Sequence, residues 1–237
     1  MAGLLYEEKF KINDKISINI PTVGEVLKKE TEYFSIITTI TAMPIDMMVQ
    51  LHKAGIDFTT INEWELFCKM FAGLKEMDTS LVFGDLDLKK FQPAINKQNG
   101  TIVLRDEEND IIIDRITHAV IANFLRKVFR IEKNVKRPGN EEAKKYMIER
   151  ATVKYERQKK KAPQSVIENY IISLVNTPEY KYNYQTTLKL SIYQFYSSLY
   201  QIIRKVKFDN LMIGCYAGTV NTEKIDQAEL NWLSVDK

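Results

Sequence analysis

The chain is 237 residues long, 45% of its residues are hydrophobic and 27% are charged, and its net charge is +3. This composition is that of a globular protein, and the length allows one large domain or two small ones. Two cysteines exclude a disulfide framework and a cysteine-rich zinc site. The first residues lack the pattern of a secretory signal, and no apolar run is long enough to span a bilayer, so we expect a soluble intracellular protein without a membrane partner.

The charge is unevenly distributed. Residues 1–114 carry 12 basic and 19 acidic side chains, residues 115–161 carry 15 and 5, and residues 162–237 carry 7 of each. A concentrated positive segment attracts polyanions or acidic protein surfaces. The alternative is that these basic side chains are solvated helix faces, or that they pair with the acidic half of the same chain.

The N-terminal residues have the pattern of two strands. Polar and apolar side chains alternate over residues 6–12 and again over residues 15–20, with Asn13 and Asp14 between the two runs. This pattern predicts a β-hairpin with one buried face. Because an isolated pair of strands is marginally stable, we expect the helices that follow to cover it.

Three helices are predicted next. Thr22 and Glu25 have the spacing of a capping box, so a helix starts there and continues to residue 43. Pro44 suits the first turn of a second helix, which ends at Gly55, and Asn62 caps a third.

Large apolar side chains gather on the second and third of these helices. Those that we select as candidate partner contacts are Met47, Met48, Trp64, Phe67 and Met70. A methionine-rich face adapts to binding partners, whereas core packing is the more common role of an apolar helix stripe. Both interpretations stay open from the sequence.

A small β-meander is predicted in the middle of the chain. Residues 83–88 and the run to Ile95 have the pattern of a turn and a short strand. On a strand, Asp85 and Asp87 can face one side and bind Mg²⁺, although turn chemistry accounts for them equally well. Asn99-Gly100 predicts a hairpin between residues 93–97 and 101–105, and a turn over 106–110 leads to a third strand over 111–113.

The basic segment contains two predicted helices, over residues 115–131 and 140–161. Asp114 caps the first, whose broad apolar stripe includes Ile116 and Val120 and leaves its basic side chains outside. The second has a narrow apolar row, so we expect it to be exposed or to bind a partner. The basic candidate contacts are Arg126, Lys127 and Arg130 on the first helix and Arg150, Lys154 and Arg157 on the second.

The C-terminal residues are mainly helical. A short helix is predicted over residues 166–174, Ser191 opens a long one, and Leu230, Trp232 and Leu233 can fold back as a closing anchor. The fold class that we predict is α+β and predominantly helical, with an N-terminal β-hairpin, a small central β-meander packed with helices, and a helical C-terminal half. The predicted units are an α+β lobe (1–114), a basic helical hairpin or connector (115–161) and a helical C-terminal lobe (162–237).

Enzyme motifs are absent from the sequence. His52 and His118 are the only histidines, they lack metal-ligand spacing, and we expect both at the surface or at helix ends. Nucleophile elbows and phosphate-binding loops are also absent. We therefore predict a protein without catalytic residues, bound metal or cofactor, which acts by contact with another macromolecule.

Several short motifs have the residues of turns and helix ends and contain no recognised catalytic pattern. They are IPTVGE (20–25), IDF (56–58), NEWELF (62–67), FGDLD (83–87), RPGNEEA (137–143) and LNWL (230–233). Through them nearly the whole chain resembles an uncharacterised family of tailed bacteriophages and prophages of low-GC Gram-positive bacteria, found among structural and tail-assembly genes.

The resemblance implies a non-enzymatic role in virion morphogenesis. The protein would act in tail assembly, as a chaperone of the tape-measure protein or as a tail or baseplate component. Its partners would be other phage structural or tail proteins in the host cytoplasm, with retention in the virion and a homo-oligomer left open. The residues themselves leave two alternatives: a basic accessory protein that binds nucleic acid non-specifically, and a metal-dependent enzyme that uses Asp85 and Asp87.

Overall fold

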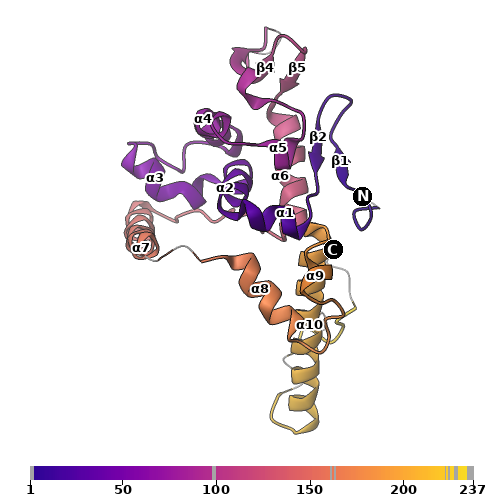
Figure 1. The fold of residues 1–237 in the computed structure, drawn as a ribbon. Coiled ribbons are helices and arrows are strands. Elements are labelled where there is room, and N and C mark those ends of the chain that lie inside the picture. Colours follow the sequence, from indigo (N-terminus) through magenta and orange to yellow (C-terminus); the bar gives the residue numbers. More distant parts are fainter. Residues whose placement is uncertain are drawn as a thin grey trace.

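The computed structural model describes residues 3–97, 100–160, 162, 164–221, 223, 225–226 and 229–233. The chain is a mostly helical α+β protein with 55% helix, which confirms the predicted fold class. The helix α6 (Arg115–Phe129) runs through the middle of the upper part, and α10 (Ile192–Tyr216) extends away from it (Figure 1). None of the helices in the described part of the chain is both long and apolar enough to cross a membrane.

The remaining elements complete two small sheets and their helical cover. The strands are β1 (Lys9–Lys11), β2 (Ser17–Asn19), β3 (Gln92–Ile95), β4 (Ile102–Asp106) and β5 (Ile111–Ile113). The helices are α1 (Val23–Lys28), α2 (Glu30–Thr41), α3 (Met48–Lys53), α4 (Glu63–Lys75), α5 (Ser80–Phe83), α7 (Glu141–Lys159), α8 (Val166–Val175) and α9 (Tyr184–Thr187). Two 3₁₀ turns are η1 (Pro44–Met47) and η2 (Leu88–Lys90).

The N-terminal hairpin is confirmed. β1 and β2 pair antiparallel with Phe10 opposite Ile18, and the side chain of Asn13 closes the turn by accepting from the backbone N–H groups of Lys15 and Ile16. Ile18 is fully buried, and the ring of Phe10 stacks on that of Phe124 with the centroids 4.1 Å apart. The β1–β2 hairpin is thus stabilised by its contact with α6, because an isolated pair of strands is only marginally stable.

The first predicted helix is divided in two. The capping box of Thr22 and Glu25 is confirmed, but α1 ends at Lys28 and α2 starts at Glu30, because Lys29 leaves the helical conformation. The bend directs the Glu30 carboxylate to the start of α8, where it accepts from the N–H groups of Val166 (2.7 Å) and Ile167 (3.0 Å). One continuous helix from residue 22 to residue 43 was therefore a wrong prediction.

The central meander is confirmed, with the strand order β3-β4-β5 and antiparallel pairing throughout. Asn99 lies outside the described residues. The turn and short strand predicted over residues 83–95 are confirmed as a turn at Gly84, which has a positive φ of 61°, and the strand β3. Asp85 and Asp87 do not lie on a strand, because Asp87 caps η2 by accepting from the N–H of Lys89. Local hydrogen bonding of a short acidic side chain thus competes successfully with strand formation here.

Two core clusters hold the elements together. The larger contains buried side chains from each of the three predicted units, such as Ile37 of α2, Phe124 of α6 and Phe195 of α10. The smaller one is formed by Ala42, Ile45, Leu51, Phe58 and Leu66. The division of the chain into three units stays a prediction.

Candidate functional site

The cap of α6 is confirmed, but its apolar face is rotated from the predicted one. Asp114 accepts from the N–H of Thr117 (2.7 Å) and starts the helix. Ile116 and Val120, which we expected in the core, are 73% and 41% exposed, whereas Arg126, which we expected outside, is 6% exposed. The rotation places two apolar side chains on the surface and draws one guanidinium inside.

Arg126 is held inside by a buried polar network. Its Nη2 donates to Glu63 Oε1 (2.6 Å) and to the backbone carbonyl of Thr41, and Lys133 pairs with the other oxygen of the same carboxylate (2.6 Å). Burial opposes ionisation of Glu63, but the hydrogen bonds from Lys133 and Arg126 outweigh it and hold the pKa of Glu63 below its ordinary value. This carboxylate anchors the start of α4 to α6.

His118 lies next to this network, in the first turn of α6 as a helix-terminal residue, but it is buried, which corrects our expectation of a surface position. Its ring stacks on that of Phe67 (4.3 Å between centroids) and lies 5.5 Å from that of Trp64. The Nε2 lies 3.1 Å from the carbonyl oxygen of Ile40, which can only accept, so Nε2 carries the proton. Burial lowers the pKa of His118 to about 4, so the ring is neutral at physiological pH.

A groove of about 780 Å³ opens above these buried side chains, between α4, α6 and the start of β4. Its walls carry the exposed apolar side chains of Ile102, Ile116 and Val120, and the smaller Cys68 and Ala119 lie between them. We call this feature the α4–α6 groove. A concave surface lined by exposed apolar side chains is typical of a site that binds a protein or a ligand.

Two side chains of α4, Trp64 and Cys68, line the α4–α6 groove in neutral form. Trp64, only 7% exposed, donates its Nε1–H to the carbonyl of Ile102 (3.3 Å), which ties α4 to β4. Burial raises the pKa of the Cys68 thiol to about 11, so it stays protonated at neutral pH. Three charged residues, Glu65, Asp114 and Arg115, are also among the lining residues, although most of the exposed lining is apolar. The groove therefore suits an apolar helix face rather than a charged ligand.

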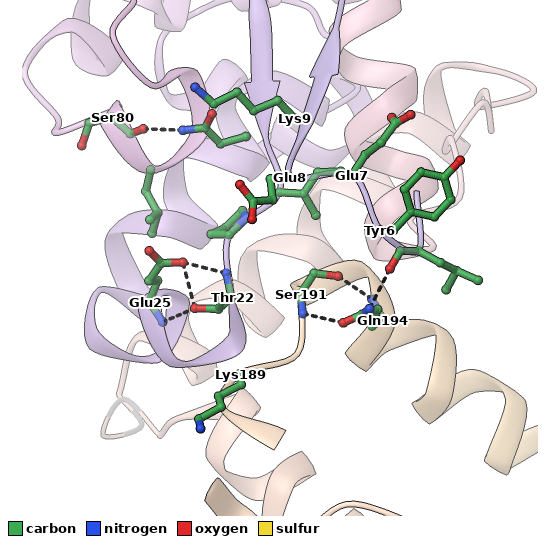
Figure 2. A pocket seen from close by; sticks show the side chains of 15 residues that line it. Tyr6, Glu7, Glu8, Lys9, Thr22, Glu25, Ser80, Lys189, Ser191 and Gln194 are labelled. Carbon is green, nitrogen blue, oxygen red and sulfur yellow. Dashed lines mark hydrogen bonds between the residues drawn. The ribbon is translucent and has the colours of Figure 1, made fainter. Parts of the chain in front are cut away.

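A second pocket, of about 590 Å³, lies where the N-terminal residues, α1 and α10 meet (Figure 2). Two capping boxes use some of its polar groups: Thr22 N donates to Glu25 Oε2 (2.8 Å), and Ser191 N donates to Gln194 Oε1 (2.9 Å). Gln194 Nε2 also donates to the carbonyl of Leu5 (2.7 Å). Hydrogen bonding within the chain thus accounts for the capping residues of this pocket, which lies where the N-terminal residues contact α10, while the charged side chains of Glu7, Glu8, Lys9 and Lys189 also line it.

The predicted methionine face is covered by α7. Met47, Met48 and Met70 are half-buried and pack on the smaller core cluster together with Met147 and Ile148 of α7. Trp64 and Phe67 lie in the larger cluster. These five predicted partner contacts therefore pack mainly within the chain itself, which is the more common role of such a stripe.

Ion pairs attach the basic segment to the acidic N-terminal half. Lys144 pairs with Asp57 (2.8 Å), and its hydrogen bond lowers the pKa of that carboxyl to about 2. Lys53 of α3 pairs with Glu156 of α7 (3.0 Å). The Lys144–Asp57, Arg126–Glu63 and Lys133–Glu63 pairs thus neutralise part of the uneven charge distribution within the chain, whereas the Lys53–Glu156 pair joins the two segments in the opposite sense.

The other basic candidate residues remain at the surface. Lys127 and Arg130 are exposed at the end of α6, where Arg130 ends the helix with a positive φ of 53°. Arg150, Lys154 and Arg157 are exposed on one face of α7, and Tyr146 lies beside Arg150. The structure thus keeps a basic face on α7 that points away from α3.

The two aspartates proposed to bind Mg²⁺ lie in a loop and not on a strand. Asp85 and Asp87 are in the loop between α5 and η2, and Asp87 is used as a cap. Within the residues that the structure describes, no group of three or more histidine, cysteine or carboxylate side chains is arranged to hold a metal ion.

The C-terminal part of the chain has a recognisable relative. Residues 158–235 match the YomV second domain. This range begins at the end of α7 and includes α8, α9 and α10, so the similarity to the YomV second domain does not extend to the α4–α6 groove. No curated protein and no solved structure matches the chain.

The lining residues of the α4–α6 groove were missed from the sequence, apart from Trp64. Ile116 and Val120 were assigned to the core, and Cys68, Ile102 and Ala119 were not selected. One signal was available: apolar residues of α6 cover more than one face of the helix, and a helix on a protein surface needs only one apolar stripe.

Proposed function

We propose that this chain is a phage protein that acts in particle assembly by binding another phage protein in the α4–α6 groove. YomV is a protein of the Bacillus prophage SPβ, and the match to its second domain supports the phage origin. The groove itself carries the proposal of protein contact, because Ile102, Ile116 and Val120 are exposed around one concave surface.

The expected occupant is an amphipathic helix of the partner. Two helices, α4 and α6, form the walls, and the small side chains of Cys68 and Ala119 between them leave room for apolar residues spaced three and four apart on a third helix. Tail assembly is the finer proposal, with a tape-measure protein or a tail or baseplate component as the partner. It is supported by the resemblance of the chain to an uncharacterised family found among phage structural and tail-assembly genes, and by this apolar groove.

Co-expression with the products of phage tail genes tests the proposal. The unchanged chain should co-purify with one of them, and the double variant Ile116→Glu/Val120→Glu should lose that partner, because two carboxylates would be desolvated in the groove. Ile172→Glu, at an apolar position of α8 that is 47% exposed, is the matched control and should keep the partner. Equal recovery with the groove variant and the control would contradict binding in the groove.

Nucleic-acid binding is a second proposal, favoured by the exposed row of Arg150, Lys154 and Arg157 on α7. Such contacts to phosphates weaken steeply as salt concentration rises. We expect the triple variant with glutamate at these positions to abolish any shift in DNA or RNA mobility at low salt. A shift that survives these substitutions, or mobility unchanged by the unmodified chain, would remove this alternative.

A further inference from the structure

A smaller cavity adjoins the α4–α6 groove. It has a volume of about 270 Å³ and lies between the start of η1, the loop that leads into α4, and residues 131–137, which follow α6. Asn62 and Arg115 line both cavities, so the two lie side by side. We call this cavity the basic pocket, because four of its lining side chains are cations: Arg115, Lys133, Lys136 and Arg137.

The basic pocket has an excess of positive charge. Among its described lining residues the one carboxylate is that of Glu63, which already pairs with Arg126 and Lys133 (2.6 Å each). The other three cations are exposed, and in the part of the chain that the structure describes they form no ion pair. Neighbouring charges of the same sign create a field that attracts an anion, so the pocket favours a negatively charged ligand.

The segment that carries two of these free cations is attached to the rest of the protein. Lys133 pairs with Glu63 (2.6 Å), and Asn134 Nδ2 donates to Asp46 Oδ1 of η1 (3.0 Å). Lys136 follows within two residues of Asn134, and Arg137 follows directly. The positive charge is therefore held beside the start of α4.

The exposed side chains favour a protein over a nucleic acid. Bases of single strands bind by stacking on accessible aromatic rings, but the aromatic residues among the described lining of the two cavities, Trp64 and Phe58, are only 7% and 5% exposed. Apolar side chains are accessible instead, since Val135 is 70% exposed in the basic pocket and Ile116 is exposed in the groove. A surface that combines apolar and positive parts suits an amphipathic peptide with carboxylates.

Two carboxylates in the α4–α6 groove separate these parts. Glu65 accepts from the N–H of Asn62 (2.8 Å) and Asp114 accepts from that of Thr117 (2.7 Å), each at the start of a helix. The helix dipoles stabilise both carboxylates in their charged form. They repel acidic side chains from the groove itself, so the acidic part of a ligand is directed to the basic pocket.

We propose that the partner helix in the α4–α6 groove carries a run of acidic side chains next to its apolar face, and that the basic pocket receives this run. The inference rests on the proposed function and adds the chemistry of the partner. Because the two cavities share lining residues, the acidic run lies within about one or two turns of the apolar stripe. Arg115 and Arg137 are suited to it, since a guanidinium binds a carboxylate through two parallel hydrogen bonds.

Fluorescence anisotropy with designed peptides tests this inference on the whole chain. Four labelled peptides share one amphipathic helix of about five turns. Two of them carry a run of glutamates, one at each end, and two carry glutamines at the same places. At low salt, the better-placed glutamate peptide should bind about tenfold more tightly than its glutamine counterpart, the combined effect of three exposed ion pairs. The difference should disappear at about 0.5 M salt, where such pairs are screened.

Neutralising the basic pocket identifies the site of this preference. Arg115→Gln/Lys136→Gln/Arg137→Gln should bind the glutamate and glutamine peptides equally, with the affinity of the unchanged chain for the glutamine peptide. Its urea unfolding should be unchanged, because all three side chains are exposed. The matched control, Arg150→Gln/Lys154→Gln/Arg157→Gln, removes as many exposed charges from α7 and should keep the preference for glutamate.

The outcomes separate this inference from the proposed function. Equal affinity of the unchanged chain for the glutamate and glutamine peptides, or a preference that survives in the pocket variant, would overturn the inference alone. A DNA duplex that binds the α7 variant but not the pocket variant would assign the pocket to phosphates and would also overturn it. If none of the peptides binds, or if Ile116→Glu/Val120→Glu binds them as well as the unchanged chain does, the proposed function fails and the inference fails with it.

Discussion

Replacing Glu63 by alanine should lower the free energy of unfolding by about 3–5 kcal/mol, the cost of leaving a buried charge without its partner. The Arg126 side chain is 6% exposed, and Glu63 supplies the only carboxylate with which it forms an ion pair among the described residues. Without it, the guanidinium keeps its contacts to the Thr41 carbonyl and the Asn123 side chain but loses its counter-charge. Urea unfolding at pH 7 measures the change.

Two further variants make this prediction specific. Arg126→Met removes the buried charge and leaves Glu63 paired with Lys133, so it should cost less than Glu63→Ala. Glu108→Ala breaks the exposed pair with Lys90 and should leave the free energy of unfolding nearly unchanged. If Glu63→Ala destabilises the protein no more than Glu108→Ala, the network does not hold α4 on α6.

Acidification should destabilise the protein through His118. The ring has a pKa of about 4 in the folded chain, below the value of about 6.5 expected when unfolded. Between these values the unfolded state binds a proton that the folded state does not. The contribution of the neutral His118 ring to the free energy of unfolding is therefore fully present above pH 6.5. It is lost progressively as the pH falls to 4, by about 3 kcal/mol in all.

The pH dependence of urea unfolding in variants isolates this contribution. His118→Phe keeps an aromatic ring between Trp64 and Phe67 but cannot titrate, so the loss of stability between pH 6.5 and pH 4 should be smaller by that amount. His52→Phe, at an exposed position of α3, is the control and should keep the slope of the unchanged chain. Identical slopes for His118→Phe and the unchanged chain would show that His118 is not buried as a neutral group.

Features that depend on neighbouring residues could be predicted from the sequence. Thr22, Asn62 and Ser191 start helices because their side chains accept from N–H groups two or three residues later, which needs no knowledge of the rest of the fold. The N-terminal hairpin and the central meander are equally local, since alternation and turn residues determine them.

Features that depend on distant segments could not be predicted. Arg126 is buried because Glu63 and Thr41, more than 60 residues earlier, meet it in space, and His118 is buried because Phe67 and Trp64 enclose its ring. Because these two polar side chains face the core, α6 is rotated about its axis relative to the predicted orientation, and Ile116 and Val120 are exposed. The α4–α6 groove is a consequence of that turn, so a prediction that places all apolar residues of α6 in the core cannot find it.

Binding of a partner in the α4–α6 groove is tested most directly by the alkylation rate of Cys68, which lines the groove, in the free chain and in the purified complex. Cys215 of α10, also half-buried, is the reference within the same molecule. Because burial raises the pKa of Cys68 to about 11, the reaction is best followed at mildly alkaline pH. We expect the partner to slow alkylation of Cys68 and to leave Cys215 unchanged. An unchanged rate at Cys68 in the complex would show that the partner binds elsewhere.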